Sequence, residues 1–239
     1  MTINTFNHKS LSVDERNRLK TKNNMGFAHL TPSKATQELY KQAETQKGTY
    51  ADIGAAYGVD TIYMVKAGAH VVAIDLETQH LDVLKKQLNV EDQQRLETRC
   101  QRFPEEVCLE SETYDAILLS RILIFLTPDA LDVTLKNVYR ALKVGGKVYV
   151  ITISPFSDKW EPVLSIFNEH KKLFPAQPLL VSNLWELLPR TRFFLPQRIQ
   201  VFDQDSLKYS LEKNGFQVID CGYESHHGTV DNYAIAQKL

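Results

Sequence analysis

The strongest constraint on the fold is an alternation of short apolar runs with amphipathic segments between residues 49 and 153. The runs TYADIG, HVVAID, YDAILLS and GKVYVITIS have the length and residue types of β-strands. The segments between them space apolar residues as a helix does, for example Leu131, Leu135, Val138 and Leu142. Strands that alternate with helices form a parallel sheet covered on both faces. The sequence therefore predicts a Rossmann-like, doubly wound α/β sheet.

The end of the chain breaks this parallel pattern. The runs FQVIDCGY and NYAIAQKL both read as strands, and only ESHHGTVD joins them. A connection this short forms an antiparallel hairpin, because a parallel crossover needs a dozen or more residues. We therefore expect the last strand of the sheet to be antiparallel.

Four regions follow from these changes of pattern. Residues 1–47 are expected to be a polar arm, either mobile or a short helical lid up to about residue 30, followed by a lid helix. Residues 48–153 are the cofactor-binding core. Residues 154–200 hold both tryptophans and are too apolar for a linker, so we expect a helical and aromatic insertion that caps a substrate. Residues 201–239 complete the core with the final hairpin.

Composition narrows the class of function. The formal net charge is −1, which gives no reason to expect a nucleic-acid partner, since such partners require a strongly basic face. No run is long enough to span a bilayer. Cys100, Cys108 and Cys221 form no CxxC pair and no metal-binding spacing, so we expect free thiols, no metal and a cytoplasmic protein.

The stretch YADIGAAYGVDT is the first candidate site. It reads as a strand, a glycine turn and the start of a helix, where ligands bind in open parallel sheets. Asp75 ends the next strand about 20 residues after Gly54, the spacing at which an acid reaches ribose hydroxyls. Asp52 lies within the first strand and would repel a pyrophosphate, whereas a cofactor with an amino group would accept it. The pattern favours an adenosine cofactor that carries an amine.

Several segments in the same order resemble one family. YADIGAAYGVDT, VVAIDLE, the run from SETYDAILLS to KVGGKVYVITIS, and FDQDSLKYSLEKNGFQVIDC together resemble a class I S-adenosylmethionine-dependent methyltransferase. The resemblance covers roughly residues 48–153 and 200–239. It implies a seven-stranded sheet whose last strand is antiparallel, and S-adenosylmethionine as cofactor with S-adenosylhomocysteine as product.

The resemblance also implies roles for individual residues. Asp52 would hold the methionine amine, Asp75 the ribose hydroxyls, and Leu76 one side of the adenine. The remaining cofactor-binding residues would be Gly54, Ala56, Gly58, Cys100, Gln101, Arg102 and Ser120. Arg121 would border the methionine moiety and the substrate. Ala56 stands where the family has its middle glycine.

Two further groups are candidates for the acceptor. His226 and His227 follow a strand at the rim where the cofactor would bind, and histidine accepts protons near neutral pH. We therefore name His226, His227 and Arg121 as candidate catalytic residues, with exposed hairpin imidazoles as the alternative. Arg190, Arg192 and Phe193 in the insertion are candidate substrate-binding residues, or part of a solvated loop.

The resemblance leaves three functions open. The first is a methyltransferase that acts on a small molecule by in-line displacement, with a protein acceptor as a variant. The second is a non-catalytic cofactor-binding or interaction module, suggested by Ala56 and the run RILIFL. The third is a nicotinamide-dependent oxidoreductase, which Asp52 and the missing GxGxxG pattern disfavour. The sequence leaves the oligomeric state open.

Overall fold

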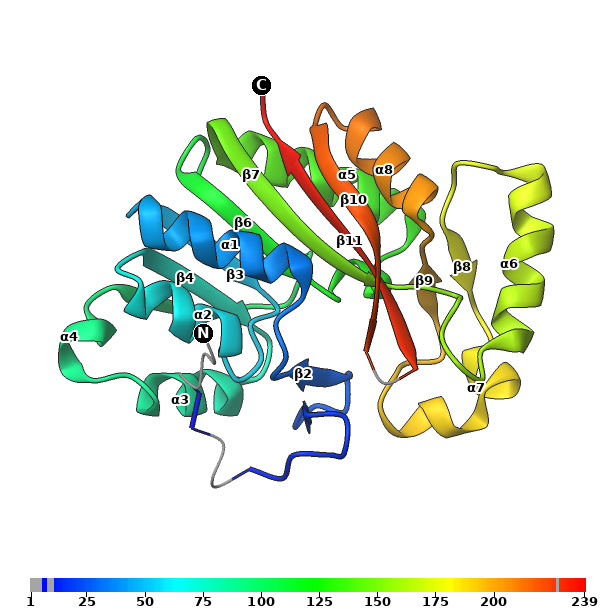
Figure 1. Cartoon of the computed structure of the whole chain (residues 1–239), viewed down its shortest axis with the longest axis horizontal. Helices are drawn as coiled ribbons and strands as arrows, with labels where there is room; N and C mark the ends of the chain where they lie inside the picture. The colour runs from blue at the N-terminus through cyan, green and yellow to red at the C-terminus, as the bar shows by residue number, and fades with distance from the viewer. Residues whose placement is uncertain (1–5, 8–10, 227) are drawn as a thin grey trace.

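The computed structural model describes residues 6–7, 11–226 and 228–239, with the backbone alone at His226. Its centre is a seven-stranded sheet of order β10-β11-β7-β6-β3-β4-β5. β3, β4, β5, β6 and β7 are parallel, whereas β11 is antiparallel to both β7 and β10 (Figure 1). The expected sheet with an antiparallel last strand is therefore confirmed. The strands are β3 (Thr49–Ile53), β4 (His70–Asp75), β5 (Leu96–Cys100), β6 (Tyr114–Ser120), β7 (Leu142–Ile153), β10 (Gln217–His226) and β11 (Thr229–Gln237).

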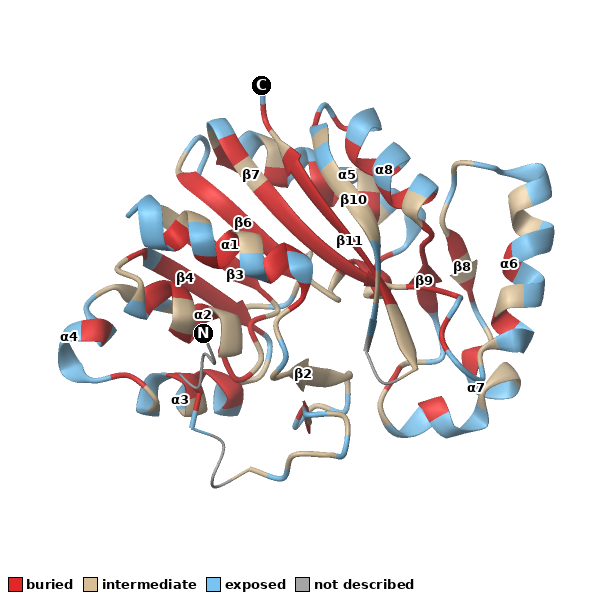
Figure 2. Cartoon of the chain, viewed as in Figure 1, coloured by how far each residue is buried: buried red, intermediate tan, exposed pale blue. Residues whose placement is uncertain are grey.

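Alternate residues of each central strand enter two separate cores, because successive side chains of a strand point to opposite faces. On β4, Val71 and Ala73 belong to one apolar cluster, whereas Val72 and Ile74 belong to the other. Figure 2 shows the central strands buried along most of their length. Burial on both faces explains why these strands read as nearly continuous apolar runs.

Helices cover both faces of the sheet. The first cluster takes apolar side chains from α1, α2 and α3, and the second takes them from α5 and α8. The helices are α1 (Lys34–Thr45), α2 (Val59–Lys66), α3 (Thr78–Lys86), α4 (Val90–Gln93), α5 (Pro128–Ala141) and α8 (Gln204–Lys213). Ser33 caps α1 through a hydrogen bond from the Thr36 amide, and Ala35, Leu39 and Ala43 of this helix are buried. This apolar stripe places α1 against β7 and β11.

Residues 154–200 form a lobe beside the sheet with an apolar cluster of their own (Figure 1). It consists of α6 (Glu161–Leu173), β8 (Leu179–Val181), α7 (Leu184–Leu187) and the 3₁₀ turn η2 (Pro189–Phe193). β8 pairs antiparallel with β9 (Ile199–Val201). A second 3₁₀ turn, η1 (Leu123–Phe125), contributes Ile124 to the same cluster.

The described part of the N-terminal segment does not form the short helical lid that was one expectation for it. It forms a β-hairpin of β1 (Arg18–Lys20) and β2 (Phe27–His29). Leu19 is buried in the first core cluster, so one apolar side chain anchors an otherwise polar segment. The hairpin lies below the sheet in Figure 1, apart from the helical layers.

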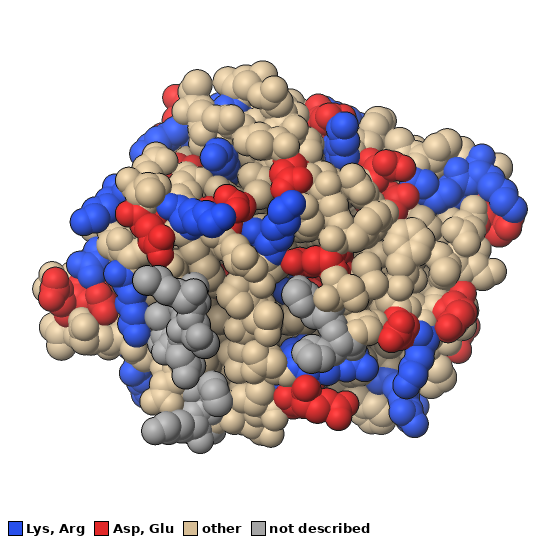
Figure 3. All heavy atoms as spheres, viewed as in Figure 1, with Lys and Arg blue, Asp and Glu red and all other residues tan. Residues whose placement is uncertain are grey.

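Two properties of the described residues bear on partners. No helix among them combines the length and apolar character needed to cross a membrane. On the face seen in Figure 3, basic and acidic side chains are interspersed.

Candidate functional site

A cavity of about 240 Å³ opens at the carboxyl ends of β4, β6 and β7. The sheet forms its floor, and the β1–β2 hairpin, the insertion and the β10–β11 turn form its walls. Sheet-derived residues of its lining include Gly54, Ala56, Asp75, Leu76, Gln101, Ser120, Arg121 and Ile153. A smaller hollow of about 50 Å³ adds Asp52 and Asp60 and shares Gly54, Ala56, Ser120 and Arg121 with the cavity. The cavity therefore lies where open α/β sheets bind ligands.

The glycine turn holds the backbone close to the cavity. Gly54 has φ +79°, and a Cβ atom there would lie 3.1 Å from the Ile122 side chain. The amides of Gly54 and Ala55 donate to the Ile74 carbonyl at 2.8 and 3.0 Å, which ties the turn to β4. Ala56 has φ +47°, a left-handed conformation that costs about 1 kcal/mol for a residue with a Cβ. The turn therefore keeps its shape with a methyl group at its middle position.

Gly58 serves packing rather than the cavity. It is the N-cap of α2 with φ +75°, and a Cβ there would lie 2.4 Å from the Leu84 side chain. The glycine therefore allows α2 and α3 to approach each other.

Asp75 ends β4 with only 7% of its surface exposed, and it lines the cavity. Its Oδ2 accepts a hydrogen bond from the Ala56 amide at 2.8 Å. Its Oδ1 accepts one from the Glu77 amide at 2.8 Å and lies 3.0 Å from Nδ1 of His80. These contacts hold the carboxylate against the glycine turn.

His80 connects Asp75 to the N-terminal hairpin. The Lys22 amide donates to His80 Nε2 at 3.0 Å, so this nitrogen is the acceptor and Nδ1 carries the proton that Asp75 accepts. The His80 ring is fully buried and packs edge-on against the Tyr57 ring, with 4.7 Å between the two ring centroids. The Tyr57 hydroxyl in turn donates to the Lys20 carbonyl at 2.8 Å. The sequence analysis did not identify His80. The available signal was its position five residues after Asp75, near the start of the predicted helix.

Asp52 is the penultimate residue of β3 and forms an acidic pair with Asp60. Asp52 is 2% exposed and accepts a 2.6 Å hydrogen bond from the Thr61 hydroxyl. Burial first, and the neighbouring Asp60 second, raise the pKa of Asp52 to about 7. Loss of water also raises the pKa of Asp60, which accepts a hydrogen bond from the Tyr40 hydroxyl. Two carboxylates held together in this way favour a cation between them.

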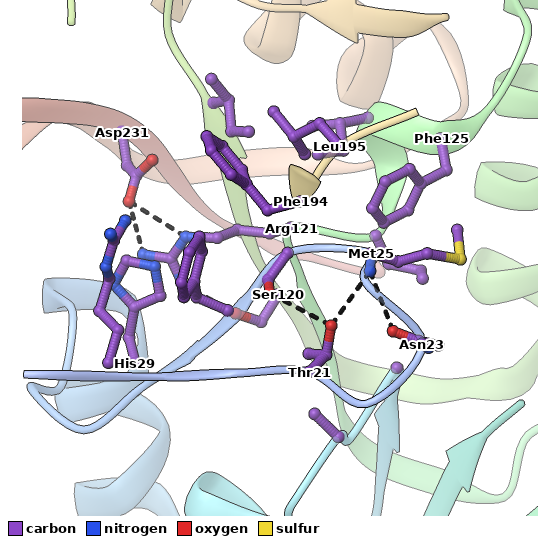
Figure 4. Close-up of a pocket in the computed structure, with 18 of the residues that line it drawn as sticks. Thr21, Asn23, Met25, His29, Ser120, Arg121, Phe125, Phe194, Leu195 and Asp231 are labelled. Atoms are coloured by element: carbon purple, nitrogen blue, oxygen red, sulfur yellow. Dashed lines mark hydrogen bonds and ion pairs between the residues drawn. The ribbon is translucent and has the colours of Figure 1, made fainter. Parts of the chain in front are cut away.

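Arg121 lies between the cavity and the smaller hollow and lines both. Its backbone has φ +55°, and its amide donates to the Ile151 carbonyl at 2.8 Å. Its guanidinium donates to Oδ2 of Asp231 through Nε at 3.1 Å and Nη2 at 2.5 Å (Figure 4). Asp231 is 2% exposed, so the charge of Arg121 is neutralised by a buried partner on β11.

The structure separates the remaining sequence candidates. Leu76 and Gln101 line the cavity, and Gln101 Oε1 is buried without a hydrogen-bond partner among the described residues. Cys100 is exposed and does not line the cavity, and neither does Arg102. His227 lies outside the described residues, as does the side chain of His226.

The candidate substrate residues of the insertion do not line the cavity either. Arg190, Arg192 and Phe193 belong to η2, and Phe193 is 59% exposed with the Arg192 guanidinium over its ring. The next two residues, Phe194 and Leu195, do line the cavity. The sequence thus pointed to the segment beside the cavity, and the residues that reach the lining are those that follow η2.

Comparison with known proteins agrees with this site. A family model described as a methyltransferase domain matches residues 51–146, which contain the glycine turn, Asp75 and Arg121. The match covers less than half of the chain, so it identifies residues 51–146 as similar to a methyltransferase domain. The matched region of this methyltransferase domain ends before the insertion and the final hairpin, so the family model does not cover most walls of the cavity.

One curated relative is similar to the methyltransferase domain. It is the cypemycin N-terminal methyltransferase of Streptomyces sp., 29% identical over 109 residues, which are 45% of this chain and 42% of that protein. The match thus spans less than half of the relative.

Solved structures extend the likeness to most of the chain. The Burkholderia thailandensis 1,6-didemethyltoxoflavin-N1-methyltransferase, solved with 1,6-didemethyltoxoflavin and S-adenosylhomocysteine, matches with a TM-score of 0.62 and 18% identity, over 86% of this chain and 79% of that one. A Listeria monocytogenes structure described as a putative S-adenosylmethionine-dependent methyltransferase matches with a TM-score of 0.60 and 19% identity, over 86% and 98%. At these identities the likeness concerns the fold.

Proposed function

We propose that the protein transfers a methyl group from S-adenosylmethionine to a small-molecule acceptor by in-line displacement. The observation that carries this proposal is the placement of Asp52 and Asp75 on adjacent strand ends, on either side of the glycine turn. Beyond these residues the cavity continues to an apolar wall, which is formed by residues other than those assigned to the cofactor.

The residues around Asp75 suit an adenosine. Asp75 Oδ2 accepts one hydrogen bond, from Ala56, which leaves acceptor capacity for a ribose hydroxyl. Gln101 Oε1 is a buried acceptor without a partner among the described residues, and an adenine amino group would satisfy it. Leu76, which is 45% exposed, offers an apolar surface beside the ring.

The residues around Asp52 suit the methionine end. Asp52 and Asp60 are carboxylates without an ion-pair partner among the described residues. A ligand ammonium group would bind between them and favour the ionised form of Asp52. The Ser120 hydroxyl and the Arg121 guanidinium border the same hollow, where they would contact the ligand carboxylate.

The chain contributes position and desolvation to the reaction. When bound, S-adenosylmethionine supplies an activated sulfonium methyl group, whose displacement leaves the bonding electron pair on sulfur while the acceptor loses a proton to solvent. Ile124, Phe125 and Ile153 give the adjoining wall an apolar character that excludes water from this space. Holding two reactants in line without intervening water supplies much of the acceleration of such displacements. The proposed mechanism therefore requires no nucleophilic side chain from the protein.

A small acceptor suits the enclosure of this site. The cavity has walls from the hairpin, the insertion and the β10–β11 turn, which together leave room for a molecule of limited size. The mixed charge of the face in Figure 3 gives no support to a nucleic-acid acceptor. The cypemycin relative makes a peptide amine the variant to test beside small molecules.

Calorimetric titration with S-adenosylmethionine, S-adenosylhomocysteine and NADH tests this function. We expect saturable binding of the first two ligands and none of NADH, because Asp52 repels a pyrophosphate. Saturable NADH binding without the other two would replace the proposal with an oxidoreductase. Binding of S-adenosylmethionine with no turnover on small-molecule and peptide pools would favour the non-catalytic module that Ala56 suggests.

A further inference from the structure

We propose that the methyl acceptor is a neutral, planar aromatic compound that binds between the β1–β2 hairpin and the insertion. This inference rests on the proposed function and names the substrate class of the same cavity. It is drawn from the lining beyond the cofactor-binding residues, where Phe27, Phe125, Trp160 and Phe194 contribute four aromatic rings.

The aromatic rings come from three segments that are far apart in the sequence. Phe27 lies on β2, Phe125 in η1, and Trp160 and Phe194 flank the helices of the insertion. The rings of Phe27 and Phe194 meet with centroids 5.3 Å apart at an interplanar angle of 54°, so the hairpin and the insertion touch through two tilted aromatic rings. In Figure 4, Phe125, Phe194 and Leu195 gather on one side of the pocket, across from Thr21 and Asn23 of the hairpin. Such a wall favours ligands with flat apolar faces.

Phe27 is held in place from its other side. The Arg18 guanidinium carbon lies 4.0 Å from the centroid of its ring, and Asp14 fixes Arg18 through an ion pair of 2.8 Å. The ring is therefore held by a guanidinium over one face and by the tilted ring of Phe194, without any aromatic ligand. A preorganised ring loses little freedom when a ligand packs against it.

The charges of this wall are balanced, which is why a neutral acceptor fits it. Arg18 pairs with Asp14, and Arg121 pairs with Asp231. Arg16 and Asp158 remain as lining residues of opposite sign, and both contact the β10–β11 turn. The Arg16 guanidinium donates to the Thr229 hydroxyl at 3.3 Å, and the Asp158 amide donates to the Gly228 carbonyl at 2.8 Å. A ligand of either charge would gain one partner and face one repulsion.

The test compares ligands that differ in planarity or charge but share one carbon skeleton. Binding of naphthol, fully saturated decahydronaphthol and naphthoate is measured by calorimetry with S-adenosylhomocysteine at saturation. We expect naphthol to bind about tenfold more tightly than decahydronaphthol, because only a flat ring packs face-on between the aromatic side chains. We expect naphthoate to bind no more tightly than naphthol. Equal binding of naphthol and decahydronaphthol overturns the aromatic assignment, and tighter binding of naphthoate overturns the neutral one.

Variants locate the effect in the molecule. Phe27→Leu and Phe194→Leu should each reduce naphthol affinity about fivefold. Phe194→Leu should also leave S-adenosylhomocysteine affinity unchanged, because Phe194 lines only the larger cavity, whereas Phe27 also lines the smaller hollow. Phe193→Leu is the matched control, since Phe193 adjoins Phe194 but does not line the cavity. An equal loss in Phe193→Leu, or no loss in the other two variants, contradicts the site.

The same titrations separate this inference from the proposed function. If S-adenosylhomocysteine does not bind, the proposed function fails, and naphthol titrated alone still reports whether the aromatic wall binds a flat ring. If S-adenosylhomocysteine binds and naphthol does not, the function stands and the acceptor class is wrong.

Discussion

The two halves of the cavity are built differently. The half in which we propose that the cofactor binds, the cofactor half, uses the ends of β3, β4 and β6 with the turns that follow them, all within residues 52–121, and the backbone of the sheet fixes their positions. The acceptor half takes its side chains from a hairpin, an insertion and a turn that are remote in sequence. The methyltransferase family model covers the floor of the cavity, whereas most of the walls lie outside it. Substitutions can test this difference between the two halves, and the contact that joins them, between Arg121 and Asp231, is the first target.

Breaking the ion pair between the halves should have the largest effect. Asp231→Asn removes the buried partner of Arg121, and we expect a loss of about 3 kcal/mol in the free energy of unfolding, because an unpaired charge stays partly buried. Urea denaturation measures it. Asp132→Asn is the control, since its pair with Lys213 has the same 2.5 Å distance but is exposed and should contribute less than about 1 kcal/mol. Equal losses would show that burial is not what matters at Arg121.

Within the cofactor half, Asp75 should matter most for binding. Asp75→Asn should weaken S-adenosylhomocysteine binding by about 2 kcal/mol, since a charged acceptor for ribose is lost. Calorimetry measures the affinity, and a thermal melt checks that the fold persists. Asp82→Asn, an exposed acid on α3, should bind normally. Unchanged binding in Asp75→Asn would remove this residue from the site.

Asp52 should make cofactor binding depend on pH. Its raised pKa means that the unliganded protein holds a proton that a ligand ammonium must displace, so affinity should rise with pH until about 7 and then level off. The slope is up to about tenfold per pH unit. The same shift makes ionisation of Asp52 costly to the fold, so its contribution to stability is greatest below about pH 4 and falls as pH rises through 7.

The variant Asp52→Asn tests whether ionisation of Asp52, and not of another acidic group, causes this pH dependence. The variant should bind S-adenosylhomocysteine with weaker affinity and without that pH dependence. Titrations in buffers of different ionisation enthalpy should show proton release in the natural protein and less in the variant. Equal release in both would assign the proton to another group, with Asp60 the first to examine.

His80 tests whether the hairpin depends on the cofactor half. His80→Leu removes the acceptor of the Lys22 amide and the donor to Asp75, so we expect about fivefold weaker S-adenosylhomocysteine binding and faster trypsin cleavage at Arg18 and Lys20. His70→Leu, an exposed histidine at the start of β4, is the control. Weaker binding without faster cleavage would mean that His80 orients Asp75 alone.

Ala56 should give the smallest effect. Ala56→Gly relieves a left-handed conformation worth about 1 kcal/mol, and the greater freedom of glycine in the unfolded chain offsets part of it. We expect a gain of a few tenths of a kcal/mol in the free energy of unfolding. A loss of stability would show that the methyl group packs usefully in the turn.

The sheet, its antiparallel last strand and most of the cofactor half can be predicted from the sequence alone. These features depend on local patterns: apolar runs, caps, a glycine turn and an acid at a fixed distance from it. The same reasoning placed Asp52, Gly54 and Asp75 where the structure brings them together, because parallel strands end at one edge of the sheet, and the family resemblance added Ala56 and Ser120.

Which residues form the walls of the cavity becomes clear only from the tertiary structure. The β1–β2 hairpin is held by Leu19 and by His80, contacts that no local pattern announces. Phe194 lines the cavity and Phe193 does not, a choice made by the packing of the insertion. Secondary structure follows from neighbours in the sequence, whereas the acceptor half is assembled from remote segments whose meeting depends on the free energy of the whole fold.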